Sequence, residues 1–144
     1  MTIFTRVAEF LDTNLLLYAY DPSEAEKHDV ARDLILGLAR SHDAAISIQV
    51  MQEFYVNVVS KITTPLTPAA ARDRLRAFAR WKVHVPIPDD MLAASVLAED
   101  HQLSFWDAMV VLSAAEMGCH TLWTEDMNHG QVLAGVAIRS PFRT

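Results

Sequence analysis

The stretch RVAEFLDTNLLLYAY, residues 6–20, decides the fold, because a strand pattern changes into a helix pattern within it. Residues 6–11 are expected to form a short strand that stops at the polar turn from Asp12 to Asn14. The apolar run at residues 15–20 then starts a helix. A strand that leads into a helix is the building unit of parallel sheets covered by helices. We therefore expect an α/β fold in which Asp12 directly follows the first strand.

The rest of the chain continues this alternation of strands and helices. Further strands are expected over residues 44–48, 83–87, 119–123 and 136–139, and helices over residues 24–40, 50–62, 69–81, 89–99 and 104–117. This order predicts a mainly parallel sheet with helices on both faces. In such folds the functional site lies beyond the carboxyl ends of the strands, so the residues at those turns are the candidates.

The composition limits the class of protein. A length of 144 residues with 51% hydrophobic residues is typical of one globular domain, residues 1–144. The formal net charge of −6 argues against a protein that binds long duplex DNA through a general positive field. No apolar run approaches the roughly 20 residues of a membrane-spanning helix. The single cysteine, Cys119, cannot form an internal disulfide, and we expect a cytoplasmic protein.

Four acidic residues fall at the turns where a site is expected. They are Asp12 after the first strand, Glu53 early in the helix that follows the second, Asp107 at the start of an apolar helix, and Asp126 after strand 119–123. Each alone has an ordinary explanation: Asp12 and Asp107 as helix caps, Glu53 as a solvated helix residue, Asp126 as a turn acid. Glu125 is as well placed in the sequence as Asp126.

Together the four acids indicate a metal site. Carboxylates gathered in one cleft repel one another and raise at least one pKa unless a cation lies between them. Oxygen ligands without cysteine or histidine suit Mg²⁺, or Mn²⁺, rather than zinc. Such an ion can activate water and neutralise charge on a phosphoryl group. The reaction that this indicates is phosphodiester hydrolysis.

Four segments resemble the motifs of the PIN-domain family, and within it the VapC-type toxins of bacterial toxin–antitoxin pairs. They are FLDTNLLLYA (10–19), SIQVMQEF (47–54), LSFWDA (103–108) and LWTEDMNHG (122–130), in the family's order. The resemblance implies a three-layer α/β/α sandwich and an endoribonuclease. It also implies that Asp12, Glu53, Asp107 and Asp126 are the catalytic, metal-binding acids, and that Asn14 and Thr124 orient them. Finally, it implies a homodimer and an antitoxin partner that blocks the site.

One position departs from the family pattern. Many relatives have a further acid two positions after the fourth motif acid, where this chain has Asn128. The number of metal ions, one or two, therefore stays open.

Basic residues are the candidates for binding the substrate. Arg72, Arg76 and Arg80 recur every four residues and are expected on one face of the helix over residues 69–81. They could guide RNA phosphates or contact the antitoxin, although a charged helix face is usually only solvated. The three tryptophans, Trp81, Trp106 and Trp123, are expected to anchor the core.

Two other functions are compatible with part of this pattern. An aspartyl phosphatase would use Asp12 as its nucleophile, but that chemistry generally needs a second acid two residues later, where Asn14 stands. A non-catalytic PIN-like binding module would not need the four acids. Metal-dependent RNA cleavage that is lost in Asp12→Asn would distinguish the nuclease from both.

Overall fold

A computed structural model describes residues 7–143 and contains one six-stranded sheet, with strand order β3-β2-β1-β4-β6-β5. The strands are β1 (Glu9–Leu11), β2 (Ala44–Ser47), β3 (Lys82–His84), β4 (Thr121–Trp123), β5 (Val132–Leu133) and β6 (Val136–Arg139). All neighbours pair in parallel except β5 and β6, which are antiparallel. The expected mainly parallel sheet is confirmed.

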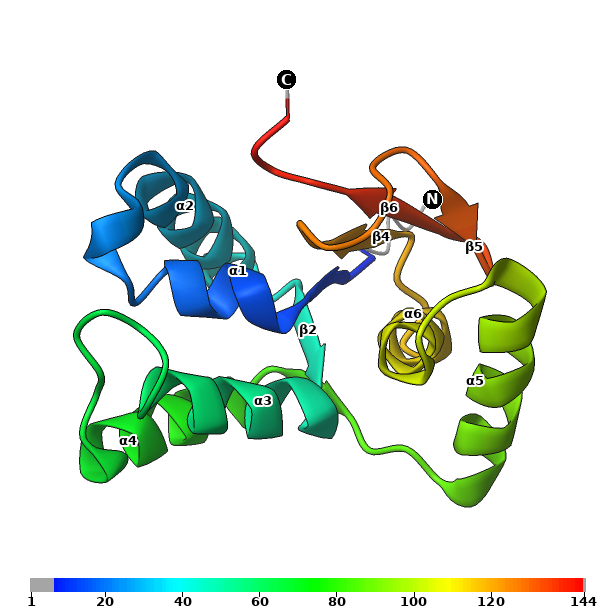
Figure 1. The fold of residues 1–144 in the computed structure, drawn as a ribbon, viewed down its shortest axis with the longest axis horizontal. Coiled ribbons are helices and arrows are strands. Elements are labelled where there is room, and N and C mark those ends of the chain that lie inside the picture. The colour runs from blue at the N-terminus through cyan, green and yellow to red at the C-terminus, as the bar shows by residue number, and fades with distance from the viewer. Residues whose placement is uncertain (1–6, 144) are drawn as a thin grey trace, which may run out of the picture.

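Helices cover both faces of this sheet. They are α1 (Thr13–Tyr18), the 3-10 helix η1 (Pro22–Glu24), α2 (Glu26–Arg40), α3 (Ile48–Val58), α4 (Pro68–Phe78), α5 (Pro88–His101) and α6 (Phe105–Glu116). Figure 1 shows α1 and α2 on one side of the central strands, and α6 with α5 on the other, so the expected α/β/α layering is confirmed. Within residues 7–143 no helix combines the length and the apolar character needed to cross a membrane.

The core forms where the strands and helices meet. The side chains of Phe10, Leu11, Ile46 and Leu122 on the central strands are completely buried. Every residue of α6 from Ala108 to Ala114 is buried as well, which explains why that helix is apolar all round. The sheet and α6 thus provide a rigid base for the turns that follow the strands.

Strand register brings distant turns together. Leu11 on β1 is paired with Trp123 on β4, so the chain leaves both strands at the same level of the sheet. The backbone N–H of Asp12 donates to the carbonyl of Trp123 at 3.0 Å, which ties the two turns together. The chain passes from β1 to β2 on one side, and β4 lies on the other side of β1. Open α/β sheets bind their ligands at such a change of direction.

Several expected boundaries are wrong. The first strand covers only residues 9–11 of the expected 6–11, and Arg6 lies outside the described residues. The expected helix over residues 24–40 is divided, because Ala25 adopts a φ of +46° between η1 and α2. The strand expected over residues 83–87 ends at His84. The short strand β5 was not expected.

Candidate metal centre

Asp12 occupies the turn between β1 and α1. Its Oδ1 accepts from the backbone N–H of Thr13 at 2.7 Å, so Asp12 caps α1, and its Oδ2 accepts from the hydroxyl of Thr124 at 2.8 Å. Both oxygens are therefore fixed, one by its own helix and one by the turn after β4. The side chain is only 6% exposed. The ordinary capping role and a role in the site are thus compatible.

Glu53 approaches Asp12 from the neighbouring helix. It lies on α3, and its Oε2 accepts from the hydroxyl of Thr13 at 2.7 Å. Its Oε1 accepts from the side-chain amide of Gln49, one turn earlier, at 2.9 Å. Glu53 is half-buried and directed towards α1, so it is not simply a solvated helix residue. Sequence analysis missed the roles of Thr13 and Gln49, although both lie in the quoted motifs.

The turn after β4 places Asp126 next to α1. The side-chain amide of Asn14 donates to Oδ2 of Asp126 at 2.9 Å and to the hydroxyl of Thr124 at 3.3 Å. The hydroxyl of Thr124, which is completely buried, also accepts from the backbone N–H of Asp126 at 3.2 Å. Thr124 thus connects Asp12 to Asp126. If Asn14 and Thr124 orient Asp12 and Asp126, as the sequence predicts, they would do so through these hydrogen bonds.

Asp107 comes from the opposite layer, in the first turn of α6. Its backbone N–H donates to the hydroxyl of Ser104, the N-cap of the helix, at 3.1 Å. The side chain is half-buried. The amide of Gln49 also donates to the carbonyl of Trp106 at 3.3 Å, which joins α3 to the start of α6. The four candidate acids therefore come from four separate segments.

The four carboxylates influence one another electrostatically. Burial raises the pKa of Asp12 from 3.8 to about 7, against the lowering effect of the bonds from Thr124 and Thr13, and the charges of Glu53 and Asp126 raise it further. Burial also raises the pKa of Asp107, with further increases from the charges of Asp126 and Glu53. Within residues 7–143, none of these four acids forms an ion pair with lysine or arginine.

This donor set fits a hard divalent cation. In the described part of the chain, no three histidine, cysteine or acidic side chains are already grouped as a metal site. Thr13, Asn14, Gln49 and Thr124 donate hydrogen bonds to three of the acids, Glu53, Asp126 and Asp12. A buried carboxylate without a cationic partner, as at Asp12, is costly, and a divalent ion with oxygen ligands would remove that cost.

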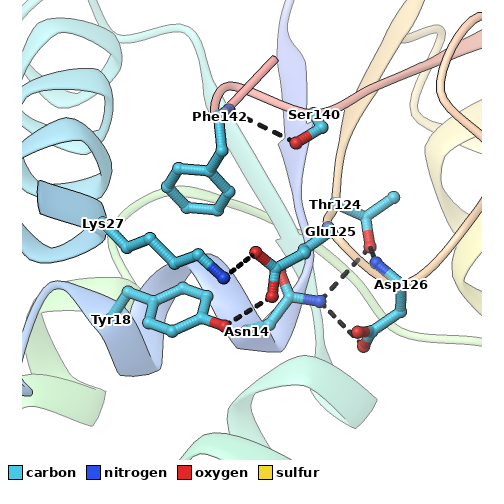
Figure 2. A network of polar contacts seen from close by, with 8 residues as sticks. All are labelled: Asn14, Tyr18, Lys27, Thr124, Glu125, Asp126, Ser140 and Phe142. Carbon is cyan, nitrogen blue, oxygen red and sulfur yellow. Dashed lines mark hydrogen bonds and ion pairs between the residues drawn. The ribbon is translucent and has the colours of Figure 1, made fainter. Parts of the chain in front are cut away.

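Glu125 faces away from the acid cluster. Figure 2 shows its carboxylate directed to Lys27 and Tyr18, whereas Asp126 points to the other side of Asn14. Burial raises the pKa of Glu125, but hydrogen bonds from Lys27 and Tyr18 and the charge of Lys27 outweigh it, and the net pKa is lowered. The sequence could not choose between Glu125 and Asp126. The structure places Asp126 with the other acids.

The candidate substrate-binding arginines lie in α4 and directly after it. Arg72, Arg76 and Arg80 are all exposed, and Arg76 contacts Asp73 at 2.6 Å. The expectation that all three share one helix face is wrong, because α4 ends at Phe78 and Arg80 follows it. Arg72 and Arg76 remain one turn apart on α4.

Two further expectations concern residues beside the acids. Trp106 is 63% exposed rather than a core anchor, because it precedes the buried part of α6 and stacks edge to face on Phe105. Asn128 is exposed in a turn in which its carbonyl accepts from the N–H of Gln131. It brings no charge to the position where relatives have an acid.

Comparisons with known proteins agree with this architecture. A family model described as PIN domain matches residues 10–132. A toxin–antitoxin complex from Klebsiella pneumoniae superposes with a TM-score of 0.70 at 17% identity, over 95% of this chain and 100% of that one. VapC20 of Mycobacterium tuberculosis, a sarcin-ricin loop cleaving toxin, superposes with a TM-score of 0.68 at 18% identity, over 84% of this chain and 92% of that one. VapBC2 from Rickettsia felis, bound to a DNA fragment from its promoter, superposes with a TM-score of 0.64 at 20% identity, over 93% of this chain and 98% of that one. No curated protein sequence matches the chain significantly.

Proposed function

This chain belongs to the PIN-domain family, and on that premise we propose that it is a Mg²⁺-dependent endoribonuclease, the toxin of a VapBC-type toxin–antitoxin pair. One observation carries the proposal. Asp12, Glu53, Asp107 and Asp126 come from four segments to the carboxyl ends of the central strands, without a basic partner among the described residues. Such a site is suited to a divalent ion and to a substrate with a phosphodiester group.

Each group in this site has a defined task in the proposed reaction. The four acids would hold Mg²⁺, with Mn²⁺ as a substitute, and the bound ion would activate water and neutralise charge on the phosphoryl group. Thr124 and Thr13 hold the two oxygens of Asp12, and Asn14 holds Asp126. Gln49 and Thr13 fix Glu53. Because Asn128 adds no charge, we propose one resident ion.

The proposed activity is tested by incubating the purified protein with total RNA, with Mg²⁺ and with a chelator. We expect discrete cuts with Mg²⁺, none with the chelator, and none from Asp107→Asn. Mapping the cut ends identifies the target RNA. Cleavage that continues in the chelator would contradict the metal mechanism, and hydrolysis of small phosphoesters with RNA intact would favour an aspartyl phosphatase. A partner-dependent role without turnover would indicate a binding module.

We expect the exposed arginines of α4 to guide the RNA. If Arg76 contacts a phosphate, Arg76→Ala weakens RNA binding. It also makes the negative slope of log affinity against log salt shallower by about 0.7, the value for one contact to a single strand. The measurement is a filter-binding titration at several salt concentrations in the chelator. Arg32→Ala on α2 is the matched control, because Arg32 is also exposed and lies near acids on its own helix. An unchanged slope for Arg76→Ala would remove Arg76 from the RNA-binding surface.

The antitoxin partner is proposed to occupy an apolar groove between α3 and α4. A cavity of about 390 Å³ is lined there by Ile48, Met51, Gln52, Tyr55, Val56 and Leu75. The groove begins at the first residue of α3, the helix that carries Glu53. A segment bound in it would therefore reach the acid cluster. Inhibition of cleavage by the product of the adjacent gene, and loss of that inhibition in Met51→Glu, tests this partner.

A homodimer is proposed through the region of α5. Five apolar side chains there are between 45% and 66% exposed, namely Val85, Ile87, Met91, Leu92 and Val96. Exposed apolar side chains that gather on a protein surface often mark a protein contact. Sedimentation should give twice the chain mass of 16.1 kDa, and a monomer would contradict the proposal.

Cys119, buried and free, agrees with the proposed cytoplasmic location.

A further inference from the structure

The carboxylate of Glu125 is completely engaged by partners outside the acid cluster. Its Oε1 accepts from the hydroxyl of Tyr18 at 2.5 Å, and its Oε2 forms an ion pair with Nζ of Lys27 at 2.5 Å. Tyr18 is the last residue of α1 and Lys27 is the second residue of α2. The turn after β4 is therefore attached to two helices through one side chain.

Two aromatic rings lie near the ammonium group of Lys27 in addition to the carboxylate of Glu125. Nζ of Lys27 lies 5.2 Å from the ring centre of Tyr18 and 5.5 Å from that of Phe142. The two rings meet edge to face with centres 5.4 Å apart. An isolated surface ion pair contributes little, but here two cation–π contacts and the hydrogen bond from Tyr18 to Glu125 add to the ion pair. The C-terminal segment thus supports the same contact.

Residues on either side of Glu125 belong to the acid cluster. Its own backbone N–H donates to Oδ1 of Asn14 at 3.3 Å, and Nδ2 of the same Asn14 donates to Asp126. Thr124, immediately before it, donates to Asp12. A rotation of the turn that released Glu125 would therefore move Thr124 and Asp126 together. Figure 2 shows Lys27 and Tyr18 on one side of this turn and Asp126 on the other.

We propose that Glu125 is a positioning residue, which with Lys27 and Tyr18 locks the turn after β4 so that Asp126 and Thr124 face the other acids. The purpose of this positioning rests on the proposed metal-dependent function. Glu125 is not itself a ligand in this arrangement, because its carboxylate is directed to Lys27 and Tyr18, on the opposite side of the turn from Asp126. The partners that orient metal ligands typically alter metal affinity by 10–100-fold when they are removed.

Lys27→Met is the decisive variant, because the competing explanations predict opposite changes in the affinity for a divalent cation. Methionine keeps the apolar contacts with Tyr18 and Phe142 but removes the charge. If Lys27 acted only through its field, removing a positive charge near the acids would strengthen binding of a cation. If Glu125 were a ligand, releasing it from Lys27 would also strengthen binding. Positioning predicts weaker binding, by about tenfold.

The experiment is a titration of Mn²⁺ alone, followed by electron paramagnetic resonance without RNA. We expect Lys27→Met and Glu125→Gln to bind Mn²⁺ about tenfold more weakly, and Lys27→Arg to bind it as the unaltered protein does. Lys61→Met, at an exposed lysine elsewhere, is the control and should leave affinity unchanged. Equal or tighter binding by Lys27→Met overturns the proposal. So does a lower unfolding temperature with unchanged Mn²⁺ affinity.

Hydrogen–deuterium exchange separates this proposal from the proposed function. The backbone N–H of Glu125 donates to Asn14 on α1 and that of Asp126 donates to Thr124 in the turn, so unlocking the turn should accelerate the exchange of both amides in Lys27→Met relative to Lys61→Met. If the unaltered protein binds no Mn²⁺, the nuclease proposal fails, and faster exchange still supports the locked turn. Unchanged exchange at these amides overturns the role of Glu125.

Discussion

Replacing Asp12 by asparagine is expected to reduce Mg²⁺-dependent RNA cleavage by at least about 10³-fold, more than the 10–100-fold typical of groups that only orient a ligand. Asp12 is the most deeply buried of the four acids, and both of its oxygens are fixed by Thr13 and Thr124. Asparagine keeps the shape but supplies no negative charge for the ion. The measurement is the initial rate of cleavage of the mapped target at saturating Mg²⁺.

A matched control distinguishes this effect from a general loss of charge. Asp100→Asn changes an exposed aspartate on α5 and should leave the rate within about twofold of the unaltered protein. Both variants should remain folded, because asparagine is as good an N-cap for α1 as aspartate. Cleavage by Asp12→Asn at more than a tenth of the normal rate would mean that Asp12 is not a metal ligand.

Local sequence signals were sufficient to predict the central strands and the turns that follow them. The change from strand to helix at Asp12 is encoded by neighbouring residues, and the acid-bearing turn after β4 follows a short apolar strand in the same way. Parallel pairing then places both turns at one edge of the sheet. The position of Asp12 and of the acid-bearing turn after β4 could therefore be predicted from local signals, whereas the choice between Glu125 and Asp126 in that turn depends on their tertiary contacts.

Features that depend on packing could not be predicted. Thr13 reaches Glu53 only because α1 lies against α3, and nothing near Glu125 in the sequence indicates Lys27 or Tyr18. Strand β5 has two residues, too few for a periodic pattern, and is made by a turn in which Ala134 and Gly135 have φ of +50° and +78°. The exposure of Trp106 likewise follows from where α6 starts relative to the sheet. Such features arise from the three-dimensional arrangement of the helices.

The metal-free protein is expected to lose stability as the pH rises from about 4 to 7, and Asp12→Asn should remove this loss. Folding raises the pKa of Asp12 from 3.8 to about 7. Between these values the folded state holds a proton that the unfolded state has released, so the free energy of unfolding falls with pH and levels off above 7. The full difference corresponds to about 4 kcal/mol. Below pH 4 both states are protonated and the effect disappears.

Comparing the unaltered protein with Asp12→Asn by urea unfolding in a chelator cancels the titrations of all groups that do not interact with Asp12. At pH 8 we expect Asp12→Asn to be more stable by about 3 kcal/mol, since about 1 kcal/mol is lost with the hydrogen bond from Thr124. At pH 4 the sign reverses, and the variant is less stable by about 1 kcal/mol. Mg²⁺ at pH 8 should stabilise the unaltered protein and not the variant, because a ligand stabilises only the state that binds it. A difference between the two proteins that stays constant from pH 4 to pH 8 would show that Asp12 is ionised without penalty, and that the buried acid does not need a cation.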